Sequence, residues 1–280
     1  MNAQKAVVVT GTSTGIGAAA ALALAQMGSL VFAGVRNEAD AERLAHEHSN
    51  IRPLRLDVTD SMSIANAAQA VRTADVRLAG LVNNAGIVVA GPIEHVSESE
   101  LRKQFEVNVL GQIAVTQAFL PQLRADRGRI VFVGSISGRI SMPFVGAYSA
   151  SKFALRALVD ALRFELAPDG IDVVLIEPGS VKTPIWRKGR DGFEERWKAL
   201  PSRYRRAMQA VLEQSEIEER TGVSSDLVTR TIVDALFASK PRTHYIVGMP
   251  ARIGAAIVPL LPARFRDMIF RKAMRIGGGK

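Results

Sequence analysis

The hydrophobic pattern of the chain alternates between short apolar runs and longer segments in which apolar residues recur at helical spacing. Six short runs, rich in Val, Ile, Leu and Ala, have the length and composition of parallel strands that are buried on both faces. They occupy residues 6–10, 30–35, 51–56, 78–82, 128–133 and 171–176. Strands that alternate with helices in this order predict an α/β fold with a doubly wound parallel sheet.

The segments between these runs carry helix signals at their ends. Gly28 is placed to end the first helix, Asp60 is placed to cap or charge the start of another, and Ser97-x-x-Glu100 forms a capping-box pattern. The predicted helices run from the glycine-rich turn to residue 27 and over residues 38–48, 60–72, 97–123, 153–166 and 224–238.

A glycine-rich turn, Gly-Thr-Ser-Thr-Gly-Ile-Gly over residues 11–17, joins the first strand to the first helix. Glycines let a backbone approach a pyrophosphate closely, and the N–H groups at a helix start supply donors and a positive dipole end. A glycine-rich turn alone is weak evidence, but a turn that follows a strand and opens a helix predicts a dinucleotide site.

The end of the second strand favours NADP over NAD. In dinucleotide-binding folds an acid about 20 residues after the glycines receives the ribose 2′-hydroxyl, whereas an Arg there accommodates a 2′-phosphate. Arg36 and Asn37 stand at that place, and residues 18–37 contain no Asp or Glu. A guanidinium can pair with a phosphate through two hydrogen bonds. The alternative is an Arg that is simply solvated at a strand end.

Polar residues also follow the fourth and fifth strands, at the sheet edge where doubly wound folds bind ligands. Asn83-Asn84-Ala85-Gly86 follows one, and Ser135 and Ser137 follow the other, although the two Asn residues could simply build a turn. Asn108 lies inside the predicted helix 97–123, where an amide needs a partner. Taken alone, Asn108 is better explained as structural than as functional.

Tyr148 and Lys152 lie four residues apart at the start of a helical segment, so they share one helix face. A nearby ammonium favours the phenolate and lowers the Tyr pKa from roughly 10 toward the range of general acid–base catalysis. The competing explanation is an ordinary surface pair.

The ordered set of these motifs resembles the short-chain dehydrogenase/reductase family. The resemblance covers residues 3–247, and Ser135 lies 13 residues before Tyr148, as in the family pattern. It implies a Rossmann fold with a seven-stranded parallel sheet, helices on both faces, and residues 243–247 as the seventh strand. One departure is Ser135-Ile136-Ser137, where the family often has two adjacent Ser residues.

The resemblance also implies residue roles. Tyr148 would exchange a proton with the substrate while hydride passes to or from the nicotinamide, and Lys152 would lower its pKa. Ser135 would hold the substrate oxygen, and Asn108 would support a water that relays protons to Lys152. The implied cofactor-binding residues are Gly11, Ser13, Thr14, Gly15, Ile16, Gly17, Arg36, Asn37, Asp57, Val58, Asn84, Ala85, Gly86, Tyr148, Lys152, Pro178, Gly179, Val181 and Thr183.

Composition limits the domain organisation and the kinds of functional site that the chain can have. At 280 residues, 48% hydrophobic and 22% charged, the chain suits one α/β domain over residues 1–250 with an extension over 251–280. It has no Cys, which excludes disulfides and thiol nucleophiles, and four scattered His residues predict no metal site. The start of the chain has no signal-peptide pattern, so a cytoplasmic protein is expected.

Residues 185–220 leave the alternation of strands and helices. Aromatic residues and Met among many charges predict a helical lid over the substrate; the alternative is a solvated helix pair with ordinary core anchors. These residues are Trp186, Phe193, Trp197, Tyr204 and Met208.

The formal charge of +9 is concentrated at the end of the chain. Residues 251–280 hold seven Lys or Arg against one Asp, a net +6, so a nucleic-acid stripe on the main domain is not expected. Residues 263–275 form a basic amphipathic pattern that predicts peripheral membrane contact or a flap over the pocket. The alternative is docking on a subunit or on the domain itself.

The chain is similar to the retinol and hydroxysteroid dehydrogenase branch, which implies a bulky apolar alcohol or ketone. The sequence therefore predicts an NADP(H)-dependent oxidoreductase of a lipophilic substrate, in a homodimer or homotetramer. The alternatives are a dinucleotide-sensing regulator without catalysis and an NAD-dependent member of the family.

Overall fold

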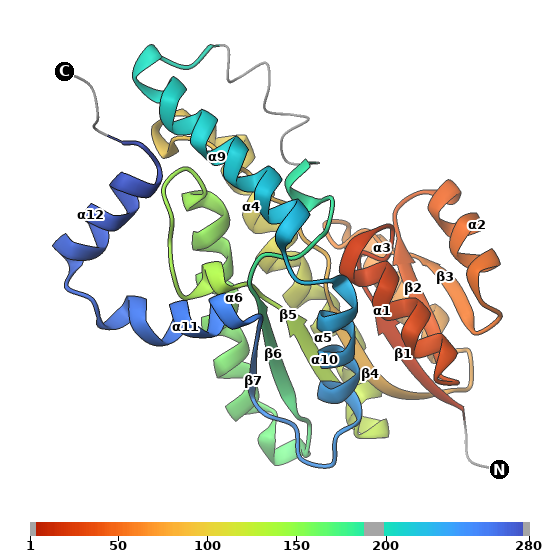
Figure 1. The fold of residues 1–280 in the computed structure, drawn as a ribbon. Coiled ribbons are helices and arrows are strands. Elements are labelled where there is room, and N and C mark those ends of the chain that lie inside the picture. Colours follow the sequence, from red (N-terminus) through yellow and green to blue (C-terminus); the bar gives the residue numbers. More distant parts are fainter. Residues whose placement is uncertain (1–3, 188–198, 277–280) are drawn as a thin grey trace.

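Seven parallel strands form one sheet in the order β3-β2-β1-β4-β5-β6-β7 (Figure 1). The computed structural model describes residues 4–187 and 199–276. The strands are β1 (Lys5–Val9), β2 (Leu30–Val35), β3 (Ile51–Arg55), β4 (Arg77–Asn83), β5 (Arg129–Val133), β6 (Val173–Pro178) and β7 (His244–Val247). The predicted doubly wound α/β fold is confirmed, including the seventh strand.

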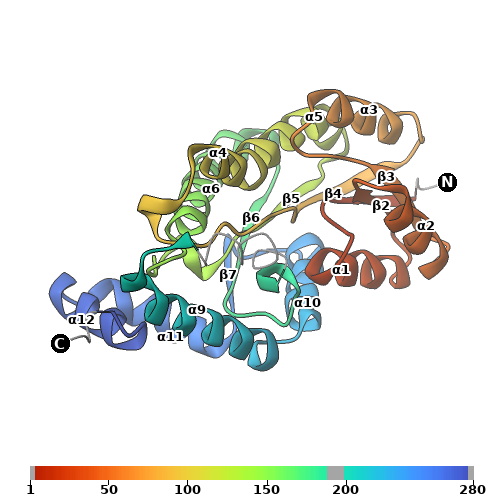
Figure 2. The same cartoon turned by 90° about the horizontal axis from the view of Figure 1, so that it is seen from above.

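Helices cover both faces of the sheet (Figure 2). One layer holds α1 (Gly15–Gln26), α2 (Glu38–Glu47) and α10 (Ser225–Phe237), and the other holds α3 (Ser61–Arg72), α4 (Glu98–Phe105), α5 (Gly111–Asp126) and α6 (Gly146–Glu165). Successive strand residues face opposite layers, so Ala6 and Val8 of β1 pack in one core while Val7 and Val9 pack in the other. This two-sided burial explains why the strands are continuously apolar.

The strand order reverses next to β1, which pairs with β2 on one side and with β4 on the other. Connections that leave β1 and β4 for opposite layers open a crevice at the carboxyl ends of these strands. The glycine-rich turn follows β1 and residues 84–86 follow β4, so the topology brings both to that crevice. Pro53 lies in β3, an edge strand, where the lost N–H is tolerated.

The helix predicted over residues 97–123 is interrupted. A π-helical turn, Glu106–Leu110, joins α4 to α5, and Asn108 lies at its centre. π-helical turns are rare and often lie at functional sites. No sequence pattern predicts this turn, because it depends on what the Asn108 side chain contacts.

The predicted lid is partly helical. α9 (Ser202–Thr221) crosses above the carboxyl ends of the strands, and Tyr204 and Met208 anchor it against Phe144 (Figure 1). Ile185 and Trp186 lie in a short helical segment before it. Phe193 and Trp197 lie outside the described residues.

Two further helices, α11 (Met249–Ile257) and α12 (Ala263–Ala273), follow β7 and are joined by a 3₁₀ turn, Val258–Leu260. The sequence predicted α12 but not α11, where Pro250 occupies the first turn, a position that tolerates Pro. In the part of the chain that the structure describes, no helix has both the length and the apolar character needed to cross a bilayer.

Candidate active site

The glycine-rich turn is braced against the loop after β4. The Thr10 hydroxyl accepts hydrogen bonds from the backbone N–H groups of Asn84 (2.9 Å) and Ala85 (3.0 Å). The Asn84 amide in turn donates to the carbonyls of Thr10 (2.9 Å) and Gly11 (3.1 Å). A Cβ on Gly17 would lie 2.3 Å from the Gly11 carbonyl oxygen, so α1 can approach the turn only because Gly17 has no side chain. Asn84 therefore shapes the turn as well as facing the crevice.

A cavity lies at this crevice, and we call it the cofactor cavity. It is lined by most of the residues that the sequence predicted to bind the dinucleotide. Gly17 lies behind the turn instead. The nominated residues on its wall are Gly11, Ser13, Thr14, Gly15, Ile16, Arg36, Asn37, Asp57, Val58, Asn84, Ala85, Gly86 and Thr183.

Two charged residues near the cofactor cavity, Asp40 and Arg43, were not predicted from the sequence. Asp40 lines the cavity, and its carboxylate accepts a hydrogen bond from the Asn37 amide (2.9 Å). Arg43 donates to the Ser13 carbonyl (2.7 Å) and lies 3.4 Å from the Asp40 carboxylate. The charge of Asp40 is thus offset by a cation one helical turn away. The signal was the i,i+3 spacing of Asp40 and Arg43 in the first helix after Arg36.

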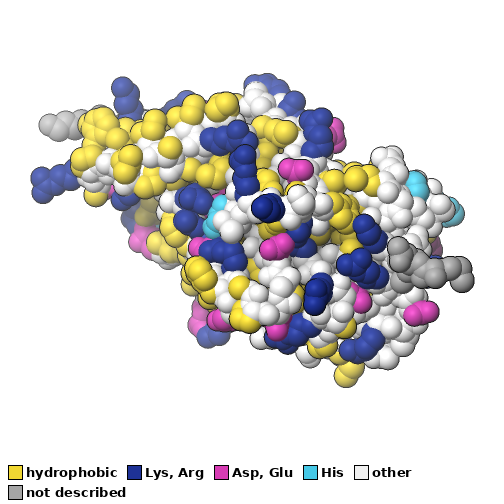
Figure 3. Space-filling view, turned by 90° about the horizontal axis from the view of Figure 1, so that it is seen from below, with side chains coloured by type: hydrophobic (Ala, Val, Ile, Leu, Met, Phe, Trp, Pro, Cys, Tyr) yellow, Lys and Arg dark blue, Asp and Glu magenta, His cyan; other side chains and the backbone are white. Residues whose placement is uncertain are grey.

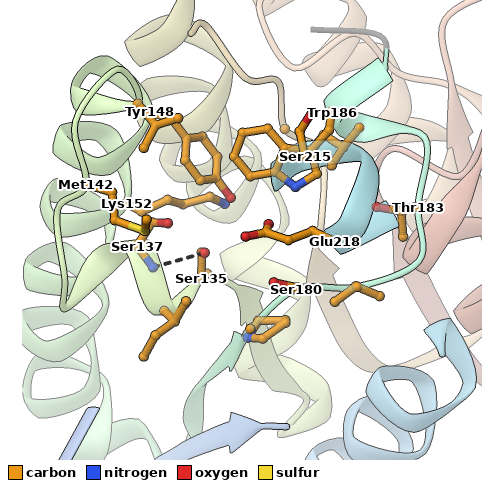
Figure 4. A pocket seen from close by; sticks show the side chains of 18 of the residues that line it. Ser135, Ser137, Met142, Tyr148, Lys152, Ser180, Thr183, Trp186, Ser215 and Glu218 are labelled. Carbon is orange, nitrogen blue, oxygen red and sulfur yellow. Dashed lines mark hydrogen bonds between the residues drawn. The ribbon is translucent and has the colours of Figure 1, made fainter. Parts of the chain in front are cut away.

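A second cavity, the substrate cavity, adjoins the first and shares Ile16, Asn84, Gly86, Thr183 and Ile185 with it. Ser135, Tyr148 and Lys152 lie on its wall (Figure 4). The remaining nominated cofactor residues, Pro178, Gly179 and Val181, line it as well.

Tyr148 lies in the first turn of α6 and is 7% exposed. The pKa of its hydroxyl is raised to about 12, mainly by burial; a hydrogen bond with Ser135 opposes this rise, and the Glu218 carboxylate adds to it. The expectation of a lowered Tyr148 pKa is wrong, because desolvation of the phenolate outweighs the hydrogen bond that lowers this pKa. The hydroxyl therefore holds its proton at neutral pH.

Lys152 lies one helical turn beyond Tyr148 and is 5% exposed. Its ammonium donates to the Val133 carbonyl at the end of β5 (3.0 Å) and lies 5.8 Å from the centroid of the Tyr148 ring. Burial lowers the pKa of the Lys152 amine to about 8. The Lys152 side chain is thus held between Tyr148 and the sheet.

Ser135 follows β5 directly, and its hydroxyl accepts a hydrogen bond from the Ser137 backbone N–H (3.1 Å). That bond leaves the Ser135 proton to donate toward Tyr148 or a substrate oxygen. Ser137 also lines the substrate cavity.

Asn108 is fully buried and is not among the side chains that line either cavity. Its amide donates to the Ile87 carbonyl (3.0 Å) and the Ser151 hydroxyl (3.1 Å), and its oxygen accepts from the Ile87 N–H (2.9 Å). A Cβ on Gly86 would lie 3.4 Å from the Asn108 oxygen and 3.9 Å from the Lys152 ammonium. Asn108 therefore braces the loop that follows β4, next to the Lys152 side chain. Its role in a water relay stays a prediction.

Two more buried amides, Gln104 and Gln112, support the same loop. They were not predicted from the sequence. Gln104 exchanges hydrogen bonds with the Val89 N–H (2.7 Å) and the Ile87 carbonyl (2.9 Å), and Gln112 donates to the Ala85 carbonyl (2.7 Å). With Asn108 they form a row at four-residue spacing, which is the signal that could have identified them.

A buried ion pair fixes the far side of the site. Arg139, just past Ser135, donates two hydrogen bonds (2.7 and 2.6 Å) to Glu177, which is fully buried near the end of β6. Burial alone raises the pKa of the Glu177 carboxyl, but hydrogen bonds from His244 and Arg139 outweigh it and hold that pKa below its ordinary value. The pair ties the Ser135 loop to Pro178 and the residues beyond it.

Comparisons with known proteins agree with this geometry. The family model described as short chain dehydrogenase matches residues 5–193. The NADPH-dependent 3-dehydrocapnine reductase of Ornithobacterium rhinotracheale is 35% identical over 276 residues, covering 96% of each chain. Human retinol dehydrogenase 16 is 36% identical over 277 residues, covering 95% of this chain and 87% of the relative.

Among solved structures, a short chain dehydrogenase from Burkholderia cenocepacia J2315 in complex with NADP is similar to this chain. It is 27% identical, has a TM-score of 0.72, and the match covers 94% of this chain and 97% of that one. Family match, fold and site agree that the chain belongs to the short-chain dehydrogenase/reductase family and is an NAD(P)-dependent oxidoreductase acting on CH–OH or C=O groups.

Proposed function

We propose that the protein is an NADP(H)-dependent oxidoreductase that interconverts a lipophilic alcohol and its carbonyl compound, of steroid, retinoid or similar bulk. One observation carries this proposal: Ser135, Tyr148 and Lys152 lie on the wall of a largely apolar cavity that adjoins the cofactor cavity.

The chain's own residues account for the proton in such a reaction. A bound nicotinamide supplies or accepts the hydride. In the reductive direction the protonated Tyr148 hydroxyl donates to the carbonyl oxygen, and Ser135 orients that oxygen by a hydrogen bond. The Lys152 ammonium is positioned to stabilise the phenolate that remains.

The lipophilic character of the substrate is supported by the cavity wall. Its apolar side chains come from the loop after Ser135, from α9 and from the end of the described chain. They include Ile136, Met142, Val145, Trp186, Val211 and Met274. The similarity to a retinol dehydrogenase points the same way.

Absorbance screening with NADPH and a panel of steroid, retinoid and aryl or alkyl ketones tests the proposal. We expect carbonyl-dependent NADPH oxidation, with kcat/KM rising as the apolar body of the ketone grows. Tight NADPH binding without turnover of any carbonyl compound would favour the dinucleotide-sensing regulator instead.

The preference for NADP is a separate prediction. Arg36 is exposed at the rim of the cofactor cavity, and Arg43 donates to Ser13 on the same rim. We expect NADPH to bind at least about ten times tighter than NADH, a difference of about 1.4 kcal/mol. Arg36→Ala should remove most of that difference without weakening NADH binding, because only the 2′-phosphate needs the guanidinium.

Dissociation constants from titration of both cofactors measure the effect. Arg52→Ala, which removes an exposed Arg from β3, is the matched control and should leave the ratio unchanged. Equal affinities in the wild type, or no loss on Arg36→Ala, would contradict the assignment.

A further inference from the structure

The substrate cavity contains a carboxylate that hydride transfer does not require. Glu218 lies near the end of α9, and its side chain reaches into the cavity toward Tyr148 and Ser135 (Figure 4). Its charge is felt at the catalytic hydroxyl, because it contributes to raising the Tyr148 pKa. The carboxylate therefore faces the place where a substrate oxygen reacts.

The negative charge of the Glu218 carboxylate is not neutralised by a nearby cation among the described residues. Its carboxylate accepts a hydrogen bond from the Gln214 amide (3.1 Å), and no Lys or Arg among residues 4–187 and 199–276 forms an ion pair with it. It is partly buried, and the surrounding wall is largely apolar, including Trp186, Val211 and Met274. A partly desolvated carboxylate with only a neutral amide partner is stabilised by a cation.

Two aromatic rings stand beside it. Trp186 packs edge-on against Tyr148 with ring centroids 5.9 Å apart, and both side chains line the same cavity as Glu218. Aromatic faces attract alkylammonium groups, and a carboxylate opposite them adds a charge-assisted hydrogen bond.

We propose that Glu218 is a specificity-determining residue that binds a protonated amine carried by the substrate close to its reacting carbonyl or hydroxyl carbon. The substrate class is then a lipophilic amino ketone or amino alcohol. This inference rests on the proposed oxidoreductase function and narrows its substrate. Binding of the ammonium also neutralises the charge that opposes ionisation of Tyr148, so the amine assists the proton transfer that it accompanies.

A matched pair of ketones tests the inference. One is a long-chain ketone with a dimethylamino group on the carbon next to the carbonyl, and the other has an isopropyl group in its place. With NADPH, at a pH where the amine is protonated, we expect kcat/KM for the amino ketone to exceed that of its isostere at least tenfold. Glu218→Gln should reduce this ratio at least tenfold, mostly through KM. Glu216→Gln, on the exposed side of α9, should leave it unchanged.

Binding separates this inference from the proposed function. Quenching of Trp fluorescence gives dissociation constants of both ketones for the NADPH complex without relying on turnover. If neither ketone is reduced but the amino ketone binds at least tenfold tighter in a Glu218-dependent way, the proposed function fails and this inference stands. If both are reduced and bound equally well, or Glu218→Gln leaves the ratio unchanged, the inference is overturned and the function stands.

A second, independent observation concerns the surface of the C-terminal helices. Large apolar side chains on α11, α12 and the turn between them are between 40% and 82% exposed. Figure 3 shows hydrophobic side chains gathered with Lys and Arg along this part of the molecule. We call this surface the apolar face; it consists of Met249, Ile253, Ile257, Leu260, Phe265, Met268 and Ile269.

The charges around the apolar face select its partner. From residue 249 to 276 the only acid is Asp267, whereas six basic residues flank the apolar side chains. A second copy related by a twofold axis would bring these like charges together, which opposes self-association. An anionic lipid surface complements both the apolar and the basic groups. The basic residues are Arg252, Arg264, Arg266, Arg271, Lys272 and Arg275.

We propose that the apolar face docks on an anionic membrane surface. A hollow between α12 and the loop after Ser135 shares Met142 and Pro143 with the substrate cavity. α12, which carries part of the apolar face, therefore borders a hollow next to the substrate cavity, and this placement suits a substrate that partitions into lipid.

Co-sedimentation with vesicles tests this proposal. We expect the full chain to bind vesicles of phosphatidylcholine with phosphatidylglycerol and to bind pure phosphatidylcholine at least tenfold more weakly. Leu260→Asp with Phe265→Asp should weaken binding at least tenfold. Met62→Asp, which changes an equally exposed apolar residue on α3, should not. No vesicle binding by the wild type, or lipid-free self-association that the double substitution abolishes, would overturn the proposal.

Discussion

Replacing Tyr148 with Phe is expected to lower kcat/KM for ketone reduction by about 10²- to 10⁴-fold, the range that general acid catalysis contributes. The substitution removes one hydroxyl from a ring that is packed against Trp186 and almost fully buried, so the shape of the cavity is kept. The NADPH dissociation constant should stay within about threefold, a change of less than about 0.7 kcal/mol.

Initial rates and cofactor titration of the same preparation measure both effects. Tyr245→Phe is the matched control, since the Tyr245 hydroxyl accepts a hydrogen bond from the Arg242 N–H (3.0 Å) and Tyr245 lies on the edge strand β7. A Tyr148→Phe variant whose turnover stays within a few-fold of wild type across the ketone panel would show that the mechanism is wrong.

Lys152 should impose a pH dependence. Burial lowers the pKa of the Lys152 amine to about 8, so the ammonium is present below that pH and is lost as the pH rises through it. If the cation stabilises the Tyr148 phenolate in the transition state, kcat/KM for reduction should be level below pH 8 and fall above it. Lys152→Met should be about 10²-fold slower and lack this limb of the profile.

The pH profile of kcat/KM, measured for the wild type and for Lys152→Met at saturating NADPH, tests whether Lys152 causes this pH dependence. Lys103→Met, an exposed substitution on α4, should keep the wild-type profile. Retention of the limb near pH 8 in Lys152→Met would assign it to another group.

The parts of the site that could be predicted from the sequence are those set by local chain geometry. The glycine-rich turn is recognisable because Gly11 and Gly15 need positive φ and Gly17 needs the absence of a side chain. Tyr148 and Lys152 are recognisable because four-residue spacing on a helix fixes their neighbourhood. The strands are recognisable because burial on both faces makes them continuously apolar.

Other features depend on contacts between distant segments and could not be predicted. The π-helical turn at Asn108 is stabilised by hydrogen bonds to Ile87 and Ser151, far away in the chain. The high pKa of Tyr148 depends on how completely the fold excludes water, which an i,i+4 pattern does not reveal. The sequence therefore predicted which residues lie in the site, but not the direction in which the Tyr148 pKa is shifted.

The substrate side was the least predictable. Glu218 is one of many acids in a polar helix, and only the path of α9 over the sheet turns its side chain inward. That path is fixed by Tyr204 and Met208 packing on Phe144, a contact across about 60 residues of chain. The sequence predicted a helical segment with aromatic anchors here, but which of its side chains enter the cavity depends on the direction of the helix.

Hydride transfer itself can be observed with NADPH that carries deuterium at the transferable position of the nicotinamide. When the wild-type protein reduces a lipophilic ketone, mass spectrometry should find one deuterium on the carbinol carbon of the alcohol, and the Tyr148→Phe variant should form this product at least about a hundredfold more slowly. Alcohol without deuterium on that carbon, or no alcohol from any ketone of the panel while NADPH binds, would contradict the assignment of this site as an NADP(H)-dependent carbonyl reductase.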